Sequence, residues 1–473
     1  MELQKFFSRK VERKIIMVFI NEAPKQVPVI YEADVCVVGG SCTGVFAAVR
    51  AARLGAKVVI VECQNSFGGV AANGLVTVWH SFYDTEFKNQ VISGLTEEAM
   101  KRLDKSDVFI DETSAHVFNP TELKCVLDDM LREAGVKIYL HTFYAGISRD
   151  GDTVNAVFVE NKDGRGAIKA KFFIDATGDG DLCRDLSIER YENPAIQPPS
   201  YVFLMQGNDE YACRDIDLKG SDPITHLMNK HAEEFDIERD WGWATDLPGL
   251  VNIKMRANTH VFGVNCGKAD DLTHAEIVGR DKMRKIKRLL RKYGDPNETY
   301  SVVNDCSYIG VRDTFHYKTK YRADHLSLLL GEACDDCILR GTYEVDSHHS
   351  DEGITFLRFD GTSQTEDSYG NITIGNWRRD LGIDPSIPIP TFYQLPFKTL
   401  VGEKYNNLIA AGRMINADPS AFGALRVMVN LNQIGEAAGV AAYLAVHWNK
   451  TVQELDGVEV ARAMSKGGSA NLG

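Results

Sequence analysis

The strongest chemical signal in the sequence is the glycine-rich stretch VVGGSCTG at residues 37–44. A dinucleotide-binding turn needs glycine at its first position for a tight bend and glycine at its sixth for close packing of the following helix. The third position must be small, so that the backbone can approach the pyrophosphate. Gly39, Ser41 and Gly44 occupy these positions. Ser41 stands where glycine is usual, but its small hydroxyl can itself reach a phosphate oxygen.

The residues that follow the turn predict how a dinucleotide is held. A helix beginning near Thr43 would direct its N-terminal dipole and free N–H groups at the pyrophosphate. Glu62 ends the next apolar run, where a carboxylate would accept both hydroxyls of the adenosine ribose. Cofactor-binding residues predicted here are Gly39, Gly40, Ser41, Cys42, Thr43, Gly44, Glu62 and Cys63. We interpret the two cysteines as packing residues, because no partner cysteine sits at a disulfide-reductase spacing.

Three later stretches indicate that the dinucleotide is FAD. NSFGGVAANGLV at 65–76 suits a backbone that lies along the phosphates and the ribityl chain. FFIDATGDGDL at 172–182 predicts a strand and a tight turn that brings N–H groups and a carboxylate to the same groups. In LIAAGRMINADPSAFGALRVM at 408–428, a helix N-terminus near 425–427 can stabilise negative charge at the flavin N1–C2=O2 edge. The further cofactor residues predicted are Gly68, Gly69, Val70, Ala71, Phe143, Thr177, Gly178, Asp179, Asp181, Gly412, Arg413, Gly423, Arg426 and Val427.

The pattern of apolar residues predicts the elements that position these motifs. Apolar runs at 34–38 and 57–62 flank a helical stretch that ends at Gly55, which is a βαβ unit and implies a parallel sheet. A helix is predicted over 120–134, a strand over 136–141 and a hairpin over 153–160 and 167–175. Residues 405–443 predict a further strand and a long helix rich in glycine and alanine.

The change of texture along the chain predicts a discontinuous domain organisation. From about 190 to 390, prolines and aromatic residues become frequent, and strands and helices are hard to separate. We therefore expect an α/β fold, with a Rossmann-like FAD-binding domain and an inserted mixed α+β substrate domain. The expected segments are an N-terminal extension (1–30), the first part of the FAD domain (31–190), a substrate or cap domain (191–394), the second part of the FAD domain (395–455) and a tail (456–473).

Taken in order, the motifs resemble a known family. They are VVGGSCTG, Glu62, GGVAANGLV, FNPTELKCVLDDMLREAG, FIDATGDGDL, YIGVRDT, TYEVDSHH, YQLPFKTLV and NNLIAAGRMINADPSAFGALRVM. The chain thereby resembles FAD-dependent oxidoreductases of the glutathione-reductase superfamily, in the branch shared with fumarate reductase-like and thiazole-synthase-like proteins. The resemblance covers most of residues 31–445 and implies an FAD domain of the glutathione-reductase type. It departs after Arg312-Asp313-Thr314, where Phe315, His316 and Tyr317 replace the family's further arginine.

Hydride transfer to a flavin needs a base for the substrate proton and a cation for an anionic or carbonyl group. His348 is the predicted base and Arg312 the predicted anchor, because both lie in motifs where the family concentrates polar residues. The same residues could instead cap a loop and form an interdomain salt bridge. His80, which could face the flavin, and His316 are the other predicted catalytic residues, and Tyr343, Asp346 and Arg413 are further candidates.

Composition excludes several classes of partner. A formal net charge of −13 argues against nucleic acid, and no apolar run approaches the length of a membrane span. A basic stretch precedes the apolar run 15–20, which is too short for a signal peptide. We expect a surface extension there, and a cytoplasmic protein with ten reduced cysteines. Cys334 and Cys337 form a CxxC without a second pair, so no metal site is predicted.

The leading functional hypothesis is therefore an FAD-dependent oxidoreductase that transfers hydride or electrons between FAD and a small organic substrate. A flavin monooxygenase or halogenase that needs an external reductant is an alternative, as is a non-catalytic flavin-binding protein. No second glycine turn follows a strand, which disfavours a built-in nicotinamide domain. The expected partner is a small molecule, without nucleic acid or membrane, and self-association into a homo-oligomer stays open.

Overall fold

The computed structural model describes residues 20–468 except 112, 208–222, 350–352 and 368. A seven-stranded sheet has the order β6-β2-β1-β9-β8-β7, with β22 also paired to β9. Strands β6, β2, β1, β9 and β22 run parallel, and β7 and β8 are antiparallel additions. The strands are β1 (Val29–Val38), β2 (Val58–Val61), β6 (Lys137–Tyr139), β7 (Phe143–Asp150), β8 (Thr153–Asn161), β9 (Gly164–Asp175) and β22 (Leu408–Ala410). The fold is thus α/β with a parallel sheet, consistent with a Rossmann-like FAD-binding domain.

The predicted βαβ unit is confirmed. Helix α2 (Cys42–Arg53) joins β1 to β2, which pair in parallel from Val35↔Val58 to Val38↔Val61. Helix α4 (Pro120–Glu133), whose N-cap Asn119 accepts from the N–H of Thr121, and the β8–β9 hairpin also match their predicted ranges. Strand β1 begins five residues earlier than its apolar run, because residues 29–33 pair with β9. This pairing is long-range and leaves no local pattern in the sequence.

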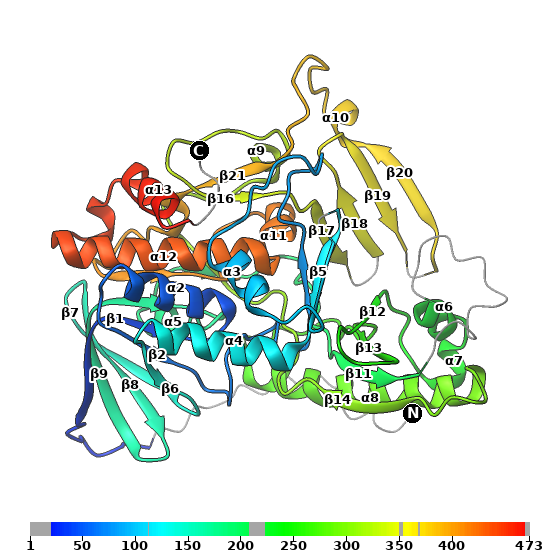
Figure 1. The fold of residues 1–473 in the computed structure, drawn as a ribbon, viewed down its shortest axis with the longest axis horizontal. Coiled ribbons are helices and arrows are strands. Elements are labelled where there is room, and N and C mark those ends of the chain that lie inside the picture. The colour runs from blue at the N-terminus through cyan, green and yellow to red at the C-terminus, as the bar shows by residue number, and fades with distance from the viewer. Residues whose placement is uncertain (1–19, 112, 208–222, 350–352, 368, 469–473) are drawn as a thin grey trace.

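The glycine- and alanine-rich C-terminal helix crosses α2 at backbone contact. In α12 (Met428–Trp448), a Cβ on Gly435 or Gly439 would overlap the carbonyl oxygen of Thr43 or Ala47. Figure 1 shows α12 lying beside α2, although the two helices are far apart in the sequence. A buried ion pair between Arg50 and Glu436 joins them. This crossing is the reason for the small residues in α12, which hold the end of the chain against the helix that follows the dinucleotide turn.

The part of the molecule beyond the parallel sheet, toward the right of Figure 1, holds smaller antiparallel sheets. One has the order β12-β13-β11-β14, another β17-β18-β19-β20, and a third β3-β5-β4. Their strands are β3 (Val78–His80), β4 (Val108–Ile110), β5 (Ala115–Phe118), β11 (Phe203–Gln206), β12 (Ala244–Asp246), β13 (Ile253–Arg256), β14 (Ser301–Asp305), β17 (Val345–His349), β18 (Gly353–Leu357), β19 (Thr362–Glu366) and β20 (Ile372–Asn376). Two-stranded sheets pair β10 (Arg190–Tyr191) with β15 (His316–Tyr317) and β16 (Cys337–Gly341) with β21 (Tyr393–Pro396).

The remaining helices cover these sheets. They are α3 (Leu95–Arg102), α5 (Asp181–Asp185), α6 (Pro223–Lys230), α7 (Ala232–Phe235), α8 (Ala269–Tyr293), α9 (His325–Leu329), α10 (Trp377–Asp380), α11 (Pro419–Leu425), α13 (Gly457–Lys466), and the 3₁₀ turns η2 (Phe397–Leu400) and η3 (Val452–Glu454). No helix among the described residues combines the length and the apolar character that a bilayer crossing requires.

Of the two end segments expected to lie outside the domains, the C-terminal one contains a packed helix. Residues 1–19 of the predicted N-terminal extension lie outside the described residues, and residues 20–28 lead to β1 without regular secondary structure. The segment expected to be a tail contains α13, whose Val460 and Met464 are buried in the main hydrophobic core. That helix packs on α12 and is part of the folded body.

Candidate functional site

A cavity of about 650 Å³ lies where the carboxyl ends of β1, β9 and β22 meet the N-terminus of α12 and the sheets of the second half. Ligands of open α/β sheets bind at this edge. The predicted residues that line it are Ser41, Cys42, Thr43, Gly68, Val70, His80, Thr177, Gly178, Arg312, His348, Gly412, Arg413, Arg426 and Val427. The predicted residues outside its lining are Gly39, Gly40, Gly44, Glu62, Cys63, Gly69, Ala71, Phe143, Asp179, Asp181, His316 and Gly423.

The first glycine turn is shaped by the close approach of β9. Gly39 has φ +104°, and a Cβ there would overlap the carbonyl oxygen of Ala176. A Cβ on Gly44 would overlap the carbonyl oxygen of Gly39, so the first turn of α2 rests on the loop itself. Ser41 is the N-cap of α2, but its side chain makes no capping hydrogen bond. Its hydroxyl and the free N–H groups of α2 are therefore available to an anion.

The second glycine pair packs directly on the first turn. The N–H of Gly68 donates to the carbonyl of Gly40 at 2.8 Å, and Ser41 forms a bridge with Gly68. Gly69 has φ +50°, and a Cβ there would lie 2.8 Å from the Cβ of Ser41. The thiol of Cys42 donates to the Gly68 carbonyl at 3.6 Å, and burial raises its pKa to about 12. Cys42 therefore packs as a neutral thiol.

Glu62 holds the same turn through its carboxylate. Oε2 accepts from the N–H of Gly40 at 2.5 Å and Oε1 from the N–H of Gln64 at 2.7 Å. Oε1 also accepts from the thiol of Cys63 at 3.3 Å, so Oε2 is the oxygen with a lone pair left for a ribose hydroxyl. Burial raises the pKa of the neighbouring Cys63 thiol to about 12. Phe143 begins β7 and is 60% exposed.

A buried acid that the sequence analysis did not assign organises the turn after β9. Asp175 accepts from the N–H and hydroxyl of Thr177 and from the N–H groups of Leu182 and Cys183, at 2.8–3.2 Å. The signal that could have found it is its place as the last residue of a buried strand. Asp181 forms an ion pair with Arg184 at 2.6 Å.

Asp179, in the turn after β9, forms an ion pair with Arg413. Asp179 accepts from Arg413 at 2.6 Å and from the hydroxyl of Thr314 at 2.9 Å. A Cβ on Gly178 would overlap the guanidinium of Arg413. Arg413 thus bridges the loop after β22 to the loop after β9, and its charge is met by Asp179.

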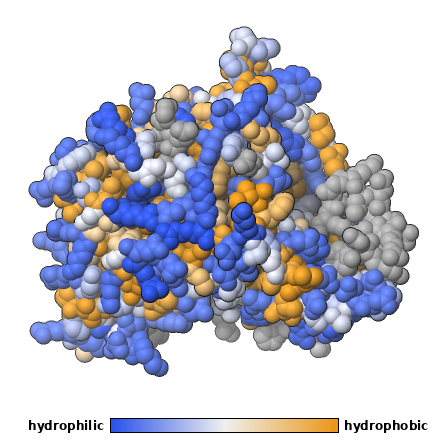
Figure 2. All heavy atoms as spheres, in the orientation of Figure 1, coloured by the Kyte–Doolittle hydropathy of each residue, from blue (hydrophilic) through white to orange (hydrophobic). Residues whose placement is uncertain are grey.

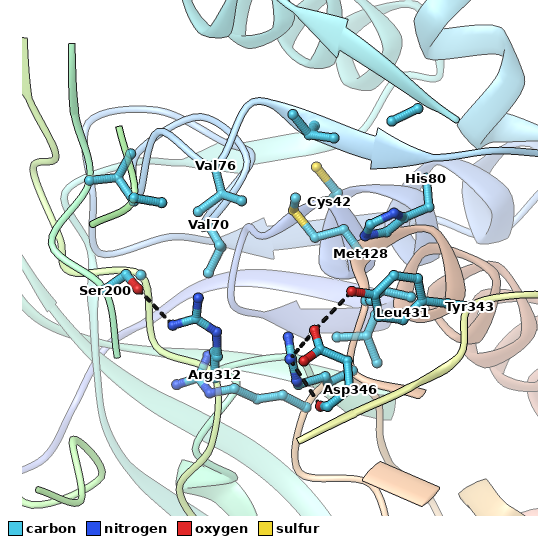
Figure 3. Close-up of a pocket in the computed structure, with 18 of the residues that line it drawn as sticks. Cys42, Val70, Val76, His80, Ser200, Arg312, Tyr343, Asp346, Met428 and Leu431 are labelled. Carbon is cyan, nitrogen blue, oxygen red and sulfur yellow. Dashed lines mark hydrogen bonds and ion pairs between the residues drawn. The ribbon is translucent and has the colours of Figure 1, made fainter. Parts of the chain in front are cut away.

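Asp346 lines another side of the cavity and contacts several of its polar side chains (Figure 3). Its Oδ2 accepts from the hydroxyl of Tyr343 at 2.8 Å and from Arg426 at 2.9 Å, and Oδ1 lies 3.2 Å from Nε2 of His348. Burial opposes ionisation, but the charge of Arg426 and the hydrogen bonds from His348 and Tyr343 hold the pKa of Asp346 well below its usual range. A Cβ on Gly423 would lie 2.7 Å from the Asp346 carbonyl, so that glycine allows α11 to pack on β17.

His348 lines the cavity and has one ring nitrogen without a partner among the described residues. It lies on β17 two residues after Asp346, on the same face of the strand. Its Nδ1 is buried and has no hydrogen-bond partner in the described part of the chain. Burial lowers the pKa of His348 to about 3, and Arg312 contributes to the shift. The ring is therefore neutral at neutral pH, with Nδ1 free to accept a proton if Nε2 carries the hydrogen toward Asp346.

Arg312 is held by neutral oxygens. Its Nη1 donates to the carbonyl of Pro198 at 2.8 Å and to the hydroxyl of Ser200 at 2.7 Å. Burial, with Arg426 nearby, lowers the pKa of Arg312 to about 10, so it is still a cation at neutral pH. Figure 3 shows this guanidinium across the cavity from Val70 and Val76.

The other two predicted histidines have different surroundings. The ring of His80 packs on that of Tyr343, with centroids 4.0 Å apart, and burial lowers its pKa to about 4. His316 is fully buried, with Nδ1 2.8 Å from the carbonyl of Ile415 and Nε2 2.9 Å from Asp313. Because both nitrogens are occupied and the residue does not line the cavity, the structure does not bring His316 together with the other three.

Sequence reasoning missed two features beside the cavity. Asn432 lines it from α12, and its buried amide nitrogen and oxygen have no partner in the described residues. Behind His348 lies His260, with ring centroids 4.9 Å apart, and its Nδ1 lies 2.6 Å from Asp240. No local pattern connects positions 240, 260 and 348, so only the fold could have identified them.

No metal centre accompanies these groups in the part of the chain that the structure describes. There, no cluster of three or more histidine, cysteine, aspartate or glutamate side chains is suited to hold a metal ion. The cysteines found free include Cys334 and Cys337, and Cys213 lies outside the described residues.

Comparison with known proteins gives one match over most of the chain. The model of a family described as FAD dependent oxidoreductase matches residues 34–464. No curated protein matches the sequence.

Similar solved structures share little sequence. A geranylgeranyl bacteriochlorophyll reductase-like protein from Thermoplasma acidophilum is 12% identical over 92% of this chain and 82% of its own, with a TM-score of 0.46. A flavoprotein/dehydrogenase from Cytophaga hutchinsonii is 13% identical over the same shares, with a TM-score of 0.42. The p-nitrophenol 4-monooxygenase of Pseudomonas putida is 12% identical over 62% of this chain and 71% of its own, with a TM-score of 0.37.

Proposed function

The chain belongs to the FAD dependent oxidoreductase family, is an enzyme and uses FAD, and on this premise we propose that it transfers hydride between FAD and a small organic substrate. In this proposal Arg312 holds the substrate and His348 exchanges its proton. One observation carries the proposal: the dinucleotide turn, Arg312 and His348, a histidine with an unpartnered ring nitrogen among the described residues, all border one cavity.

The residues present fit FAD. The side chain of the N-cap residue Ser41 makes no capping hydrogen bond to the N–H groups at the start of α2. At the other end of the cavity, Asn432 has an unpartnered amide donor and acceptor beside the N-terminus of α12. We propose that the pyrophosphate binds at the turn and that Asn432 and the N–H groups near Val427 meet the polar edge of the flavin.

The chemistry divides between the cofactor and the side chains. FAD, when bound, supplies the hydride acceptor or donor. Asp346 orients His348 through Nε2, and Arg426 and Tyr343 hold Asp346 in place. An anionic substrate group on Arg312 would remove one of the causes that lower the pKa of His348. Substrate binding would thus make His348 a stronger base when a proton must be taken.

We also propose the finer assignments of fold and family. The FAD-binding domain would be of the glutathione-reductase type and would combine residues 31–190 with 395–455, and the branch would be the one shared with fumarate reductase-like proteins. The parallel pairing of β22 with β9 supports the combination of the two segments. Residues 191–394 would form the substrate domain, which carries Arg312 and His348.

The proposal is tested on the purified holoenzyme. Bound flavin absorbs at about 450 nm. The enzyme is mixed anaerobically with sugars, amino acids and hydroxy acids, and a substrate should bleach this absorbance band. Arg312→Ala should weaken substrate binding while FAD is retained. A flavin that no organic substrate reduces without oxygen, but that an external reductant reduces before substrate hydroxylation or halogenation, would support the monooxygenase or halogenase alternative instead.

A further inference from the structure

The cavity has an apolar half that the proposed chemistry does not use. Strands β3, β4, β5, β12 and β18 and their flanking residues contribute aliphatic and aromatic side chains to it. Those that matter here are Val78, Phe109, Val117, Trp243, Ile354 and Phe356. They come from three separate sheets, so the apolar half exists only where these sheets meet.

Two of these side chains stay in water although they line a cavity. Phe109 is 60% exposed and Trp243 is 37% exposed, while Ile354 and Phe356 are half-buried. Figure 2 shows apolar residues gathered over β5 and over β12 and β13, near the middle of this face. Large apolar side chains that face one cavity lose contact with water when an apolar ligand covers them, and this favours binding.

Among the described residues on the polar side of the same cavity, Arg312 is an arginine that forms no direct ion pair with a carboxylate. Arg413 pairs with Asp179 and Arg426 pairs with Asp346, whereas the hydrogen bonds of Arg312 go to the carbonyl of Pro198 and the hydroxyl of Ser200. Burial lowers the pKa of Arg312 and the charges of Asp346 and Asp240 oppose this shift, but neither carboxylate accepts a hydrogen bond from it. A guanidinium that is removed from bulk water and forms no direct ion pair is stabilised further by an anionic ligand. The forked donors of arginine suit a carboxylate in particular.

From these two features, and resting on the proposed function, we propose that the substrate is an amphipathic organic acid. Its carboxylate binds Arg312, and its hydrocarbon or aromatic body lies against Phe109, Trp243 and Phe356. Polar metabolites with hydroxyls along their length, such as sugars, fit this arrangement less well, because its apolar side chains cannot hydrogen-bond to them. Among the described residues, the polar side chains that line the cavity beside this half include Asp111, Ser114 and Thr245.

Two ligand series test this inference on the holoenzyme. Straight-chain carboxylates from acetate to decanoate, and the primary alcohols of the same lengths, are titrated while the flavin absorbance spectrum is followed. The carboxylates should bind about fourfold more tightly for each added methylene group until the apolar half is filled. The alcohols should follow the same slope at lower affinity, because they lack the charge that Arg312 recognises.

Matched variants locate the effect. Trp243→Ala and Phe356→Ala should flatten the dependence of carboxylate affinity on chain length. Ile374→Ala is the control, since Ile374 is 62% exposed on β20 of the same sheet as Phe356 and does not line the cavity. Arg312→Gln should remove the advantage of carboxylates over alcohols.

The results separate this inference from the proposed function. Carboxylates that bind with one affinity at every chain length would overturn the amphipathic substrate and leave Arg312 as an anion anchor. Carboxylates that never bind better than alcohols would overturn both. The wild-type series alone decides these outcomes, so the inference is testable even if a variant does not fold.

Discussion

The two ends of the cavity are built in different ways. At the end that we propose for the cofactor, the first turn is shaped by backbone groups and glycines, and Glu62 and Asp175 accept hydrogen bonds from N–H groups of the same loops. At the end that we propose for the substrate, side chains from distant strands converge, and Nδ1 of His348 and Nε of Arg426 lack partners among the described residues. Unpartnered groups also occur on the cofactor side, at Asn432 and at Nε of Arg413. The two ends therefore differ in what shapes them, which is consecutive residues at one end and separate strands at the other.

The largest effect should come from breaking the cofactor end without touching the substrate end. In Gly44→Val, the new side chain overlaps the carbonyl of Gly39, so the turn must open. We expect FAD affinity to fall by about 100-fold or more, the equivalent of about 3 kcal/mol of overpacking strain. The measurement is the flavin absorbance at about 450 nm, divided by the protein concentration, after gel filtration. Gly402→Val is the control, because nothing lies within 4 Å of a Cβ there; a soluble Gly44→Val protein with full FAD would refute the pyrophosphate site.

The reverse change should break the substrate end alone. We expect His348→Ala to retain FAD and to reduce the rate of flavin reduction by about 100-fold, with substrate affinity nearly intact, because proton transfer is lost. Stopped-flow reduction under anaerobic conditions measures it. His349→Ala is the matched control, since His349 is the next residue of β17, points to the opposite face and does not line the cavity. Equal rates in the two variants would remove His348 from the chemistry.

A milder change sharpens the account of the cofactor end. Glu62→Gln keeps an acceptor but puts an amide N–H₂ where the carboxylate now meets the N–H of Gly40 or Gln64. FAD affinity should fall by about 1–3 kcal/mol, the range for charge-assisted hydrogen bonds. Isothermal titration of the apoprotein with FAD measures the change, with Glu32→Gln on the exposed part of β1 as the control. An unchanged affinity would mean that the ribose is held elsewhere.

The smallest expected effect is a loss of folding stability at acidic pH. His348 is neutral in the fold because its pKa is lowered to about 3, whereas an unfolded histidine takes up a proton below about pH 6.5. The stability that this neutral ring contributes is therefore present above pH 6.5 and is lost as the pH falls toward 3. The expected loss is about 1 kcal/mol between pH 6.5 and 5.5. As the pH falls, hydrogen exchange should increase in β17 before it increases in β1. His348→Gln should flatten the pH dependence of Tm, and the control His349→Gln should not. Hydrogen exchange that increases first in β1 would contradict the contrast between the two ends.

The sequence and the structure contribute unequally to these two ends. The βαβ unit, α4 and the β8–β9 hairpin follow from patterns within about 40 residues, and the structure has them close to the predicted ranges. The order of the small sheets between residues 190 and 390 could not be predicted, because antiparallel pairs such as β16 and β21 join strands that are far apart in the chain. Local patterns contain no information about such pairing.

The sequence by itself determined the family and the cofactor, because the dinucleotide turn and the later glycine-rich motifs are each made of consecutive residues and keep a fixed order along the chain. The tertiary structure alone decided that Arg312 and His348 border the same cavity as this turn, that His316 does not, and that Asn432 and His260 lie beside it. The physical reason is that backbone recognition depends on neighbours in the chain, whereas a group of side chains that binds a substrate depends on how separate elements pack.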